Sequence, residues 1–171
     1  MRLIAALVAA VLGYVPMSVS AEPVVDAVQA HCITPLYLDT ELGFGLERAP
    51  KQMEAKLLQG KVARLYRTDD PKILVVAHES DRTCEIMALG TDLAAFDTAI
   101  STWTVGEMPF TASDDSVLLT DAPSGGYYVA ALPEGDFIQV FVAVRPGAKF
   151  IGVTVGRVGD SAMARQVLGI E

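Results

Sequence analysis

Residues 137–157 read FIQVFVAVRPGAKFIGVTVGR, and they give the clearest indication of a β-sheet in the chain. Residues 137–144 are almost all apolar and are rich in aromatic and β-branched side chains, which is typical of a strand inside a sheet. Arg-Pro-Gly-Ala at 145–148 is a turn signal, and a second β-rich run follows at 149–157. We therefore expect an antiparallel hairpin here.

Three shorter β-rich runs precede this hairpin, at residues 61–67, 72–78 and 83–89. The turn signals Asp-Asp-Pro at 69–71 and Ser-Asp-Arg at 80–82 separate them. Their short spacing and their alternation of apolar and polar residues predict an antiparallel meander.

Helices are expected where apolar residues recur every three or four positions. The first begins at Pro23 and should end at Pro35, and the second follows Pro50 with Met53, Leu57 and Leu58 as its apolar face. A third covers residues 93–103, where Trp103 continues the apolar stripe as a core residue, and a fourth follows Ser161. The expected fold is α+β: an antiparallel sheet of hairpin-linked strands, helices packed on one face, and one disulfide.

The chain has 171 residues, a length typical of a single domain, with 13 Lys and Arg against 21 Asp and Glu. The formal net charge is −8, and basic residues form no run. Phosphate groups are bound by clustered Lys and Arg, so this composition excludes nucleic acid and anionic membrane surfaces as expected partners.

Residues 1–21 have the pattern of a secretory signal peptide. Arg2 precedes an apolar run that is shorter than a membrane-spanning helix, and small residues lie before Glu22. A membrane anchor is the alternative. Cleavage after Ala21 would leave residues 22–171 as a single α+β domain with net charge −9 and no membrane segment. The absence of Asn and the abundance of Ala fit an exported bacterial protein, periplasmic or secreted.

Cys32 and Cys84 are the two cysteines of the chain. Two cysteines in an exported protein usually pair, so we expect a disulfide that joins the first helix to the third run of the meander. A zinc site with His31 and His78 is a weaker interpretation, because neither His–Cys pair has the spacing of a zinc knuckle. A catalytic thiolate is a third interpretation, but neither cysteine lies in a nucleophile motif.

The sequence contains no nucleophile elbow, no phosphate-binding glycine loop and no zinc-protease helix. The leading hypothesis is therefore a non-enzymatic domain that binds a protein or small molecule, without a cofactor or metal. The alternative is an envelope enzyme whose polar site assembles from distant residues, His78 with Glu85 or Arg82.

Residues 124–128 read SGGYY, which resembles the Ser-Gly-x-x-Tyr loop of bacterial periplasmic lysozyme inhibitors. In that family a Ser and a Tyr enter the lysozyme cleft. The resemblance implies a binding loop with Ser124, Gly125 and Tyr128, of which Ser124 and Tyr128 would be the contact residues. Ser-Gly-Gly is also ordinary turn chemistry.

The chain also resembles small exported proteobacterial proteins of uncharacterised function, over residues 25–105. The matching features are a helix ending in Cys, an Ala-Pro-led helix at 49–50, and a Cys-Glu-Ile strand at 84–86 that ends in Gly90. This resemblance implies a disulfide-bonded α+β envelope domain and brings no activity with it.

Overall fold

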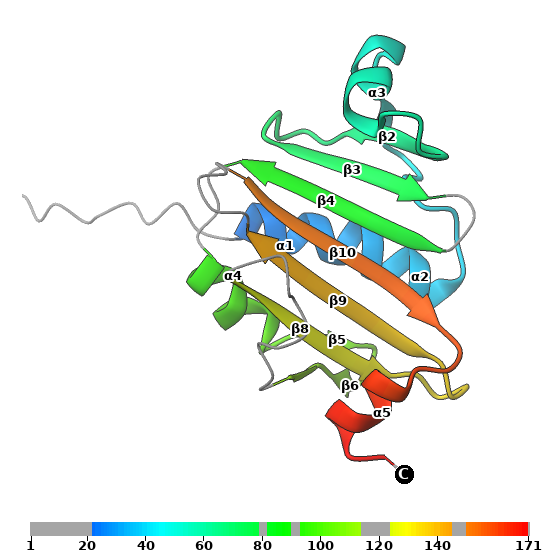
Figure 1. Cartoon of the computed structure of the whole chain (residues 1–171), viewed down its shortest axis with the longest axis vertical. Helices are drawn as coiled ribbons and strands as arrows, with labels where there is room; N and C mark the ends of the chain where they lie inside the picture. The colour runs from blue at the N-terminus through cyan, green and yellow to red at the C-terminus, as the bar shows by residue number, and fades with distance from the viewer. Residues whose placement is uncertain (1–21, 79–81, 90–92, 114–123, 145–149, 171) are drawn as a thin grey trace, which may run out of the picture.

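The computed structural model describes residues 22–78, 82–89, 93–113, 124–144 and 150–170, with one large antiparallel sheet among them (Figure 1). The strand order is β1-β2-β3-β4-β10-β9-β8-β7, and β5 pairs with β6 as a separate ribbon. The bounds of the large sheet's strands are β1 Glu47–Arg48, β2 Ala63–Arg67, β3 Ile73–His78, β4 Thr83–Leu89, β7 Thr111–Ala112, β8 Ser124–Ala131, β9 Phe137–Val144 and β10 Phe150–Val158. The ribbon consists of β5 Thr104–Val105 and β6 Met108–Pro109.

Two meanders make up the large sheet, as the α+β interpretation predicts. The first contains β1 to β4 and the second contains β7 to β10. They join where β10, the last strand of the chain, pairs with β4 on one side and with β9 on the other. The apolar run at 137–144 is β9, an interior strand, so this prediction is confirmed. The predicted signal peptide at 1–21 and the predicted turn at 145–148 lie outside the described residues.

Most of the helices form a layer on one face of the sheet (Figure 1). A continuous helical rod crosses this face, with α4 beside it. Helix α5 packs near β8 from the opposite face, and α3 lies at the β2 edge. The rod consists of α1 Glu22–Val28, the π-helical segment η1 Gln29–Ile33 and α2 Thr34–Leu38. The other helices are α3 Lys51–Leu58, α4 Leu93–Ile100 and α5 Ala162–Leu168.

Pro35 was expected to end the first helix, and this prediction is wrong. The chain stays helical to Leu38 because Pro35 falls in the first turn of α2, where a missing N–H costs little. The π-helical turn before it is closed by a hydrogen bond from the Thr34 N–H to the Gln29 carbonyl. A local widening of the helix therefore accommodates a residue that usually breaks one.

Alternation along the strands places an apolar core between the sheet and the helical layer. Val75, Ile86, Val140 and Val155 come from four adjacent strands and are fully buried on this face. Trp103 is also buried and meets the ring of Phe96 edge-on, with 6.0 Å between ring centroids. The prediction that Trp103 is a core residue is confirmed.

The predicted disulfide joins the helical layer to the sheet. Cys32 in η1 and Cys84 in β4 are bonded, with their Cα atoms 5.4 Å apart, and both are buried. The bridge closes a loop with a sequence separation of 52 residues. A loop of this length is expected to stabilise the fold by about 4 kcal/mol.

Helix α3 differs from the sequence-based expectation. Leu58 is buried against Leu65 and Val76, but Met53 and Leu57 are exposed. The expected apolar face is only partly covered because α3 packs against β2, near one end of the sheet, instead of lying over its centre.

None of the helices in the described parts of the chain is both long and apolar enough to cross a membrane.

Candidate functional site

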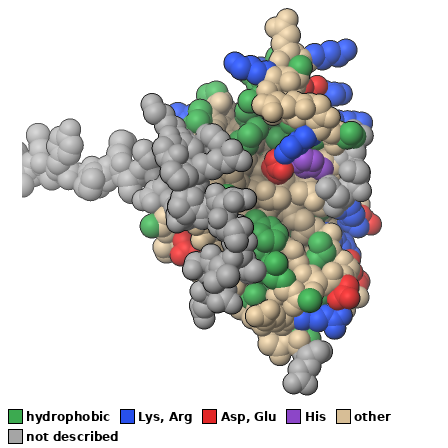
Figure 2. Space-filling view, viewed as in Figure 1, with side chains coloured by type: hydrophobic (Ala, Val, Ile, Leu, Met, Phe, Trp, Pro, Cys, Tyr) green, Lys and Arg blue, Asp and Glu red, His purple; other side chains and the backbone are tan. Residues whose placement is uncertain are grey.

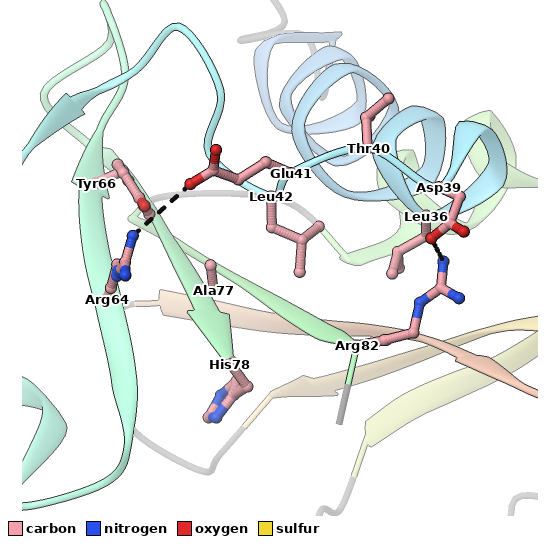
Figure 3. A pocket seen from close by; sticks show the side chains of 10 residues that line it. All are labelled: Leu36, Asp39, Thr40, Glu41, Leu42, Arg64, Tyr66, Ala77, His78 and Arg82. Carbon is pink, nitrogen blue, oxygen red and sulfur yellow. Dashed lines mark ion pairs between the residues drawn. The ribbon is translucent and has the colours of Figure 1, made fainter. Parts of the chain in front are cut away.

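A pocket of 380 Å³ opens where the helical rod ends and the chain returns toward the sheet (Figure 3). Its walls come from α2, the loop after α2, strands β2 and β3, and the residue that precedes β4. The lining residues are Leu36, Asp39, Thr40, Glu41, Leu42, Arg64, Tyr66, Ala77, His78 and Arg82. The volume is within the range of small-molecule sites.

The loop after α2, residues 39–46, is held against the sheet by its own backbone geometry. Asp39 adopts a left-handed conformation with φ 56°, and the Thr40 N–H donates to the Pro35 carbonyl at 2.9 Å, so the helix ends and the chain turns. Gly43 then lies directly on the Tyr66 ring, where an added Cβ would be 2.5 Å from a ring carbon. A side chain at residue 43 would push this loop away from the sheet.

The floor of the pocket is apolar. Leu36 and Leu42 come from the helical side, and Ala77 faces them from β3 (Figure 3). Arg64 and Tyr66 lie on the same side of β2, two residues apart, so alternation directs both toward the loop. The pocket therefore has an apolar floor and an aromatic wall.

Two ion pairs cross the mouth of the pocket. A guanidinium nitrogen of Arg64 lies 3.7 Å from a carboxylate oxygen of Glu41, and one of Arg82 lies 2.5 Å from Asp39 (Figure 3). Both arginines belong to the sheet side, and both carboxylates belong to the 39–46 loop. The mouth thus carries balanced charge, with cations on the sheet side and anions on the loop.

The polar residues proposed from the sequence divide between two sides of the sheet. His78 Nε2 lies 3.1 Å from Glu85 Oε1, although the geometry is not that of a hydrogen bond. Glu85 and the His78 ring lie on the face opposite the helical layer, since His78 pairs with Thr83, two residues before Glu85. Arg82 instead turns to the pocket and pairs with Asp39. His78 and Glu85 are brought together as proposed, and Arg82 does not join them.

The segment that resembles an inhibitor loop is a strand. Ser124 and Gly125 pair with Val144 and Ala143 of β9. Tyr128 is only 2% exposed, because it faces the core under α4, and its hydroxyl donates to the Asp97 carboxylate. Burial, followed by this carboxylate, raises the pKa of Tyr128 above that of a free tyrosine. Tyr128 would have to leave the core before it could contact a partner.

The disulfide also decides between the interpretations of the cysteines. Both sulfur atoms are bonded to each other, so neither is a thiolate for zinc or for nucleophilic attack in this state. His31 is partly buried beside Cys32 in η1, and this burial lowers its pKa more than nearby Asp69 raises it. Within the described ranges, no group of three or more His, Cys, Asp or Glu side chains could hold a metal ion.

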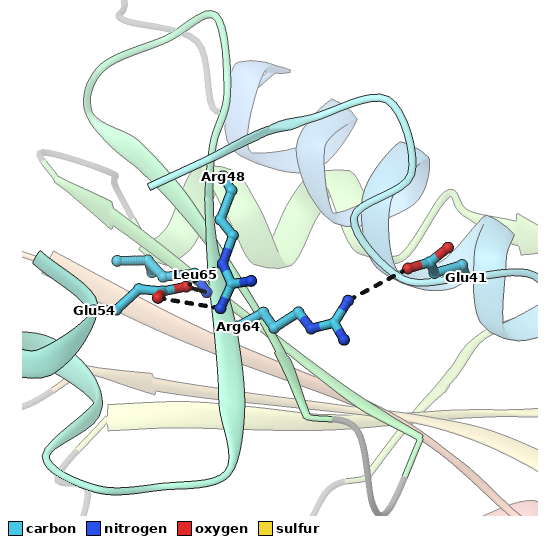
Figure 4. Close-up of polar contacts among 5 residues, drawn as sticks. All are labelled: Glu41, Arg48, Glu54, Arg64 and Leu65. Atoms are coloured by element: carbon cyan, nitrogen blue, oxygen red, sulfur yellow. Dashed lines mark hydrogen bonds and ion pairs between the residues drawn. The ribbon is translucent and has the colours of Figure 1, made fainter. Parts of the chain in front are cut away.

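A second polar cluster closes the edge of β2 (Figure 4). The Leu65 N–H, which points away from β3, donates to Glu54 Oε1 at 3.1 Å. Arg48 donates to both oxygens of the same carboxylate, at 3.0 and 3.3 Å. These hydrogen bonds, that from Arg48 above all, lower the pKa of Glu54. The cluster is structural, since it satisfies an edge N–H that another strand could otherwise pair with.

The face that carries α5 shows no continuous apolar surface in the part that grey atoms leave visible (Figure 2). Hydrophobic side chains there lie in small groups between polar side chains and backbone. Large exposed apolar patches usually mark protein interfaces, so this visible area gives no support for one.

Sequence reasoning missed most of the pocket. Asp39, Glu41 and Arg64 had no motif around them, and they meet only when the loop folds over β2. The usable signals were local: the alternation of Arg64 and Tyr66, and the glycines at 43 and 45, both with positive φ.

No protein-family model, curated protein or solved structure matches the chain. The site is therefore interpreted from its own geometry.

Proposed function

We propose that this chain is an exported, non-enzymatic binding domain that takes a small molecule into the pocket between α2 and the β2–β3 strands. The observation that carries the proposal is the 380 Å³ cavity, with its apolar floor of Leu36, Leu42 and Ala77 and its charged mouth. Small-molecule sites combine a mostly apolar lining with a few convergent polar groups.

The arrangement of polar groups favours binding over catalysis. The two acids at the mouth, Asp39 and Glu41, are largely exposed and each pairs with an arginine, an arrangement that suits charge recognition better than the activation of a nucleophile. The His78–Glu85 contact, which could serve acid–base chemistry, lies on the opposite side of the sheet from the pocket's apolar floor. His78 is among the residues that line the pocket, but alternation directs its imidazole, like Glu85, to the opposite face of the sheet from Ala77.

A fragment screen by NMR tests the proposal. The ¹⁵N-labelled protein, residues 22–171, is titrated with a library of small amphipathic fragments. Bound fragments are expected to shift the amide resonances of Leu36, Tyr66 and Ala77 together. Shifts that cluster elsewhere in the molecule would overturn the proposal.

Two substitutions of alanine by leucine, one inside the pocket and one outside it, supply a matched control for this screen. Ala77→Leu fills the cavity from its floor and is expected to abolish binding. Ala143→Leu adds the same atoms on the opposite face of the sheet, at a residue that does not line the pocket, and is expected to leave binding unchanged. Fragments that bind Ala77→Leu as tightly as the original protein would contradict the pocket assignment.

Export has a separate test. The full chain is expressed in a bacterium with a secretory system, and the intact mass of the periplasmic or secreted product is measured. A product that begins at Glu22 is expected. Recovery of the chain only in the cytoplasm, with residues 1–21 intact, would contradict export.

A further inference from the structure

We propose that the pocket selects a small amphipathic carboxylic acid, whose carboxylate replaces Glu41 or Asp39 on Arg64 or Arg82 while its apolar part lies on the pocket floor. This inference rests on the proposed function and adds the chemical class of the ligand.

The protein's own carboxylates identify the chemistry of the mouth. Each arginine of the pocket already holds a carboxylate, and each of these carboxylates is on the 39–46 loop. A guanidinium binds a carboxylate through a planar fork of N–H donors, so a ligand carboxylate fits the same positions. Asp39 and Glu41 thus occupy the positions on the arginines that the ligand's carboxylate would take.

Because Asp39 and Glu41 are exposed, little free energy is needed to displace either carboxylate from its arginine. The side chains of Glu41 and Asp39 are 69% and 75% exposed, so both are already largely hydrated. A displaced carboxylate would turn into water and recover full hydration without leaving a buried charge. Exposed ion pairs of this kind contribute little to stability, which limits the cost of exchange.

The arginines are the better fixed partners. Arg64 belongs to β2, which pairs with β3 along its length, and Arg82 directly precedes β4, which carries the disulfide. The acids belong to the 39–46 loop, and their side chains are 69% and 75% exposed, against 42% and 44% for the two arginines. An anionic ligand that displaces a loop acid therefore pairs with an arginine held by the sheet. A cationic ligand would instead have to pair with Asp39 or Glu41, which are more exposed.

The floor between the two ion pairs selects the rest of the ligand. Leu36, Leu42 and Ala77 lie between Arg64 on one side and Arg82 on the other (Figure 3). A free inorganic anion would leave this surface exposed, but a short hydrocarbon chain would cover it. The net charge of −8 repels anions at long range, so the arginines and the apolar floor must supply the affinity locally.

The test compares three probes with the same hydrocarbon chain: octanoate, 1-octanol and octylamine, titrated at pH 7 and followed by the amide resonances of the pocket. Octanoate is expected to bind about fivefold or more tightly than 1-octanol, and octylamine is expected to bind most weakly. Equal affinity for octanoate and 1-octanol, with both blocked by Ala77→Leu, would overturn the carboxylate inference and leave the proposed function standing.

Arginine variants locate the charged contact. Arg64→Gln or Arg82→Gln is expected to lower octanoate affinity about fivefold, without changing the affinity for 1-octanol. Arg67→Gln is the control, since Arg67 is on the same strand, is similarly exposed and pairs with Glu47 outside the pocket. An equal loss in Arg67→Gln, or no loss in either pocket variant, would contradict the inference.

Removal of a competing acid is expected to raise octanoate affinity, whereas removal of a pocket arginine lowers it. Glu41→Gln is expected to raise octanoate affinity about two- to fivefold, because the ligand no longer competes with Glu41 for Arg64. A lower octanoate affinity in Glu41→Gln, or octylamine as the tightest probe, would overturn the inference. If none of the three probes shifts pocket resonances, the inference fails, and the fragment screen decides the proposed function independently.

Discussion

The sheet face under the helical rod is filled differently at its centre and toward the β2 edge. Over β4 and β10, apolar side chains and the Cys32–Cys84 bridge fill the space beneath the rod. Over β2 and β3, the rod has ended, and a loop held by Gly43 and two ion pairs leaves a cavity. The packed region over β4 and β10 stabilises the fold, whereas the region over β2 and β3 contains a cavity that a ligand can enter.

The largest expected effect is on the bridge that fixes the centre. The double variant Cys32→Ala and Cys84→Ala should lower the free energy of unfolding by about 4 kcal/mol, because the unfolded chain regains the freedom of a long loop. Urea denaturation of the variant, compared with the oxidised and the reduced original protein, measures this change. A loss below about 1 kcal/mol would mean that the bridge is not a main source of stability.

A matched pair of truncations compares the two regions directly. Ile86→Ala removes a fully buried side chain at the centre and should cost about 3 kcal/mol. Leu42→Ala removes a half-buried side chain beside the cavity and should cost about 1 kcal/mol, since fewer contacts are lost. Equal losses in urea denaturation would show that the pocket margin is packed as tightly as the centre.

Much of this centre could be predicted from the sequence. The alternation in residues 61–89 and 137–157 defined strands to within a few residues, because strand pairing follows local apolar patterns. The disulfide could be predicted from the two cysteines together with the expectation of export, and the structure contains it. His78 and Glu85 were proposed together from the sequence, and the pairing of His78 with Thr83 places both on one face of the sheet.

The pocket region over β2 and β3 could not be predicted in the same way. The pocket joins Asp39, Arg64 and Arg82, which depend on how a loop without periodicity folds onto a distant strand. The prediction for Pro35 was wrong because the effect of a proline depends on its position within a helix. The π-helical segment before α2 places Pro35 in the first turn of α2, where its missing N–H costs little. Met53 and Leu57 misled because an apolar stripe predicts a buried face only where the fold provides a surface to cover it.

A smaller effect is expected at the cluster that closes the β2 edge. Glu54→Gln should lower the free energy of unfolding by less than about 1 kcal/mol, since the carboxylate is shared by Arg48 and the Leu65 N–H at a partly solvated site. The folded-state pKa of Glu54 lies below its ordinary value of 4.5. The stabilisation is therefore present above the unfolded pKa and is lost as pH falls through the folded pKa.

Urea denaturation of both proteins at several pH values measures this difference. The gap between the original protein and Glu54→Gln should be constant at neutral pH and should shrink in acid. A gap that widens as the pH falls would contradict the assignment of the pKa shift to these hydrogen bonds.

The smallest stability effect is expected at the pocket mouth itself. Arg64→Gln and Arg67→Gln should each change the free energy of unfolding by about 0.5 kcal/mol or less, because both ion pairs are exposed. The two variants should therefore be equally stable, even though they are expected to differ in octanoate binding. A large destabilisation in Arg64→Gln alone would assign the ion pair to the fold and weaken its role in binding.

The position of β10 has a consequence for how the molecule is made. Because β10 lies between β4 and β9, each of these two strands keeps one unpaired edge until residue 158 is available. A nascent chain can form hairpins early but cannot close the sheet before nearly all of it has been synthesised. The sheet is therefore completed by one of the last segments of the chain to be made, and its closure joins two meanders that can each form earlier.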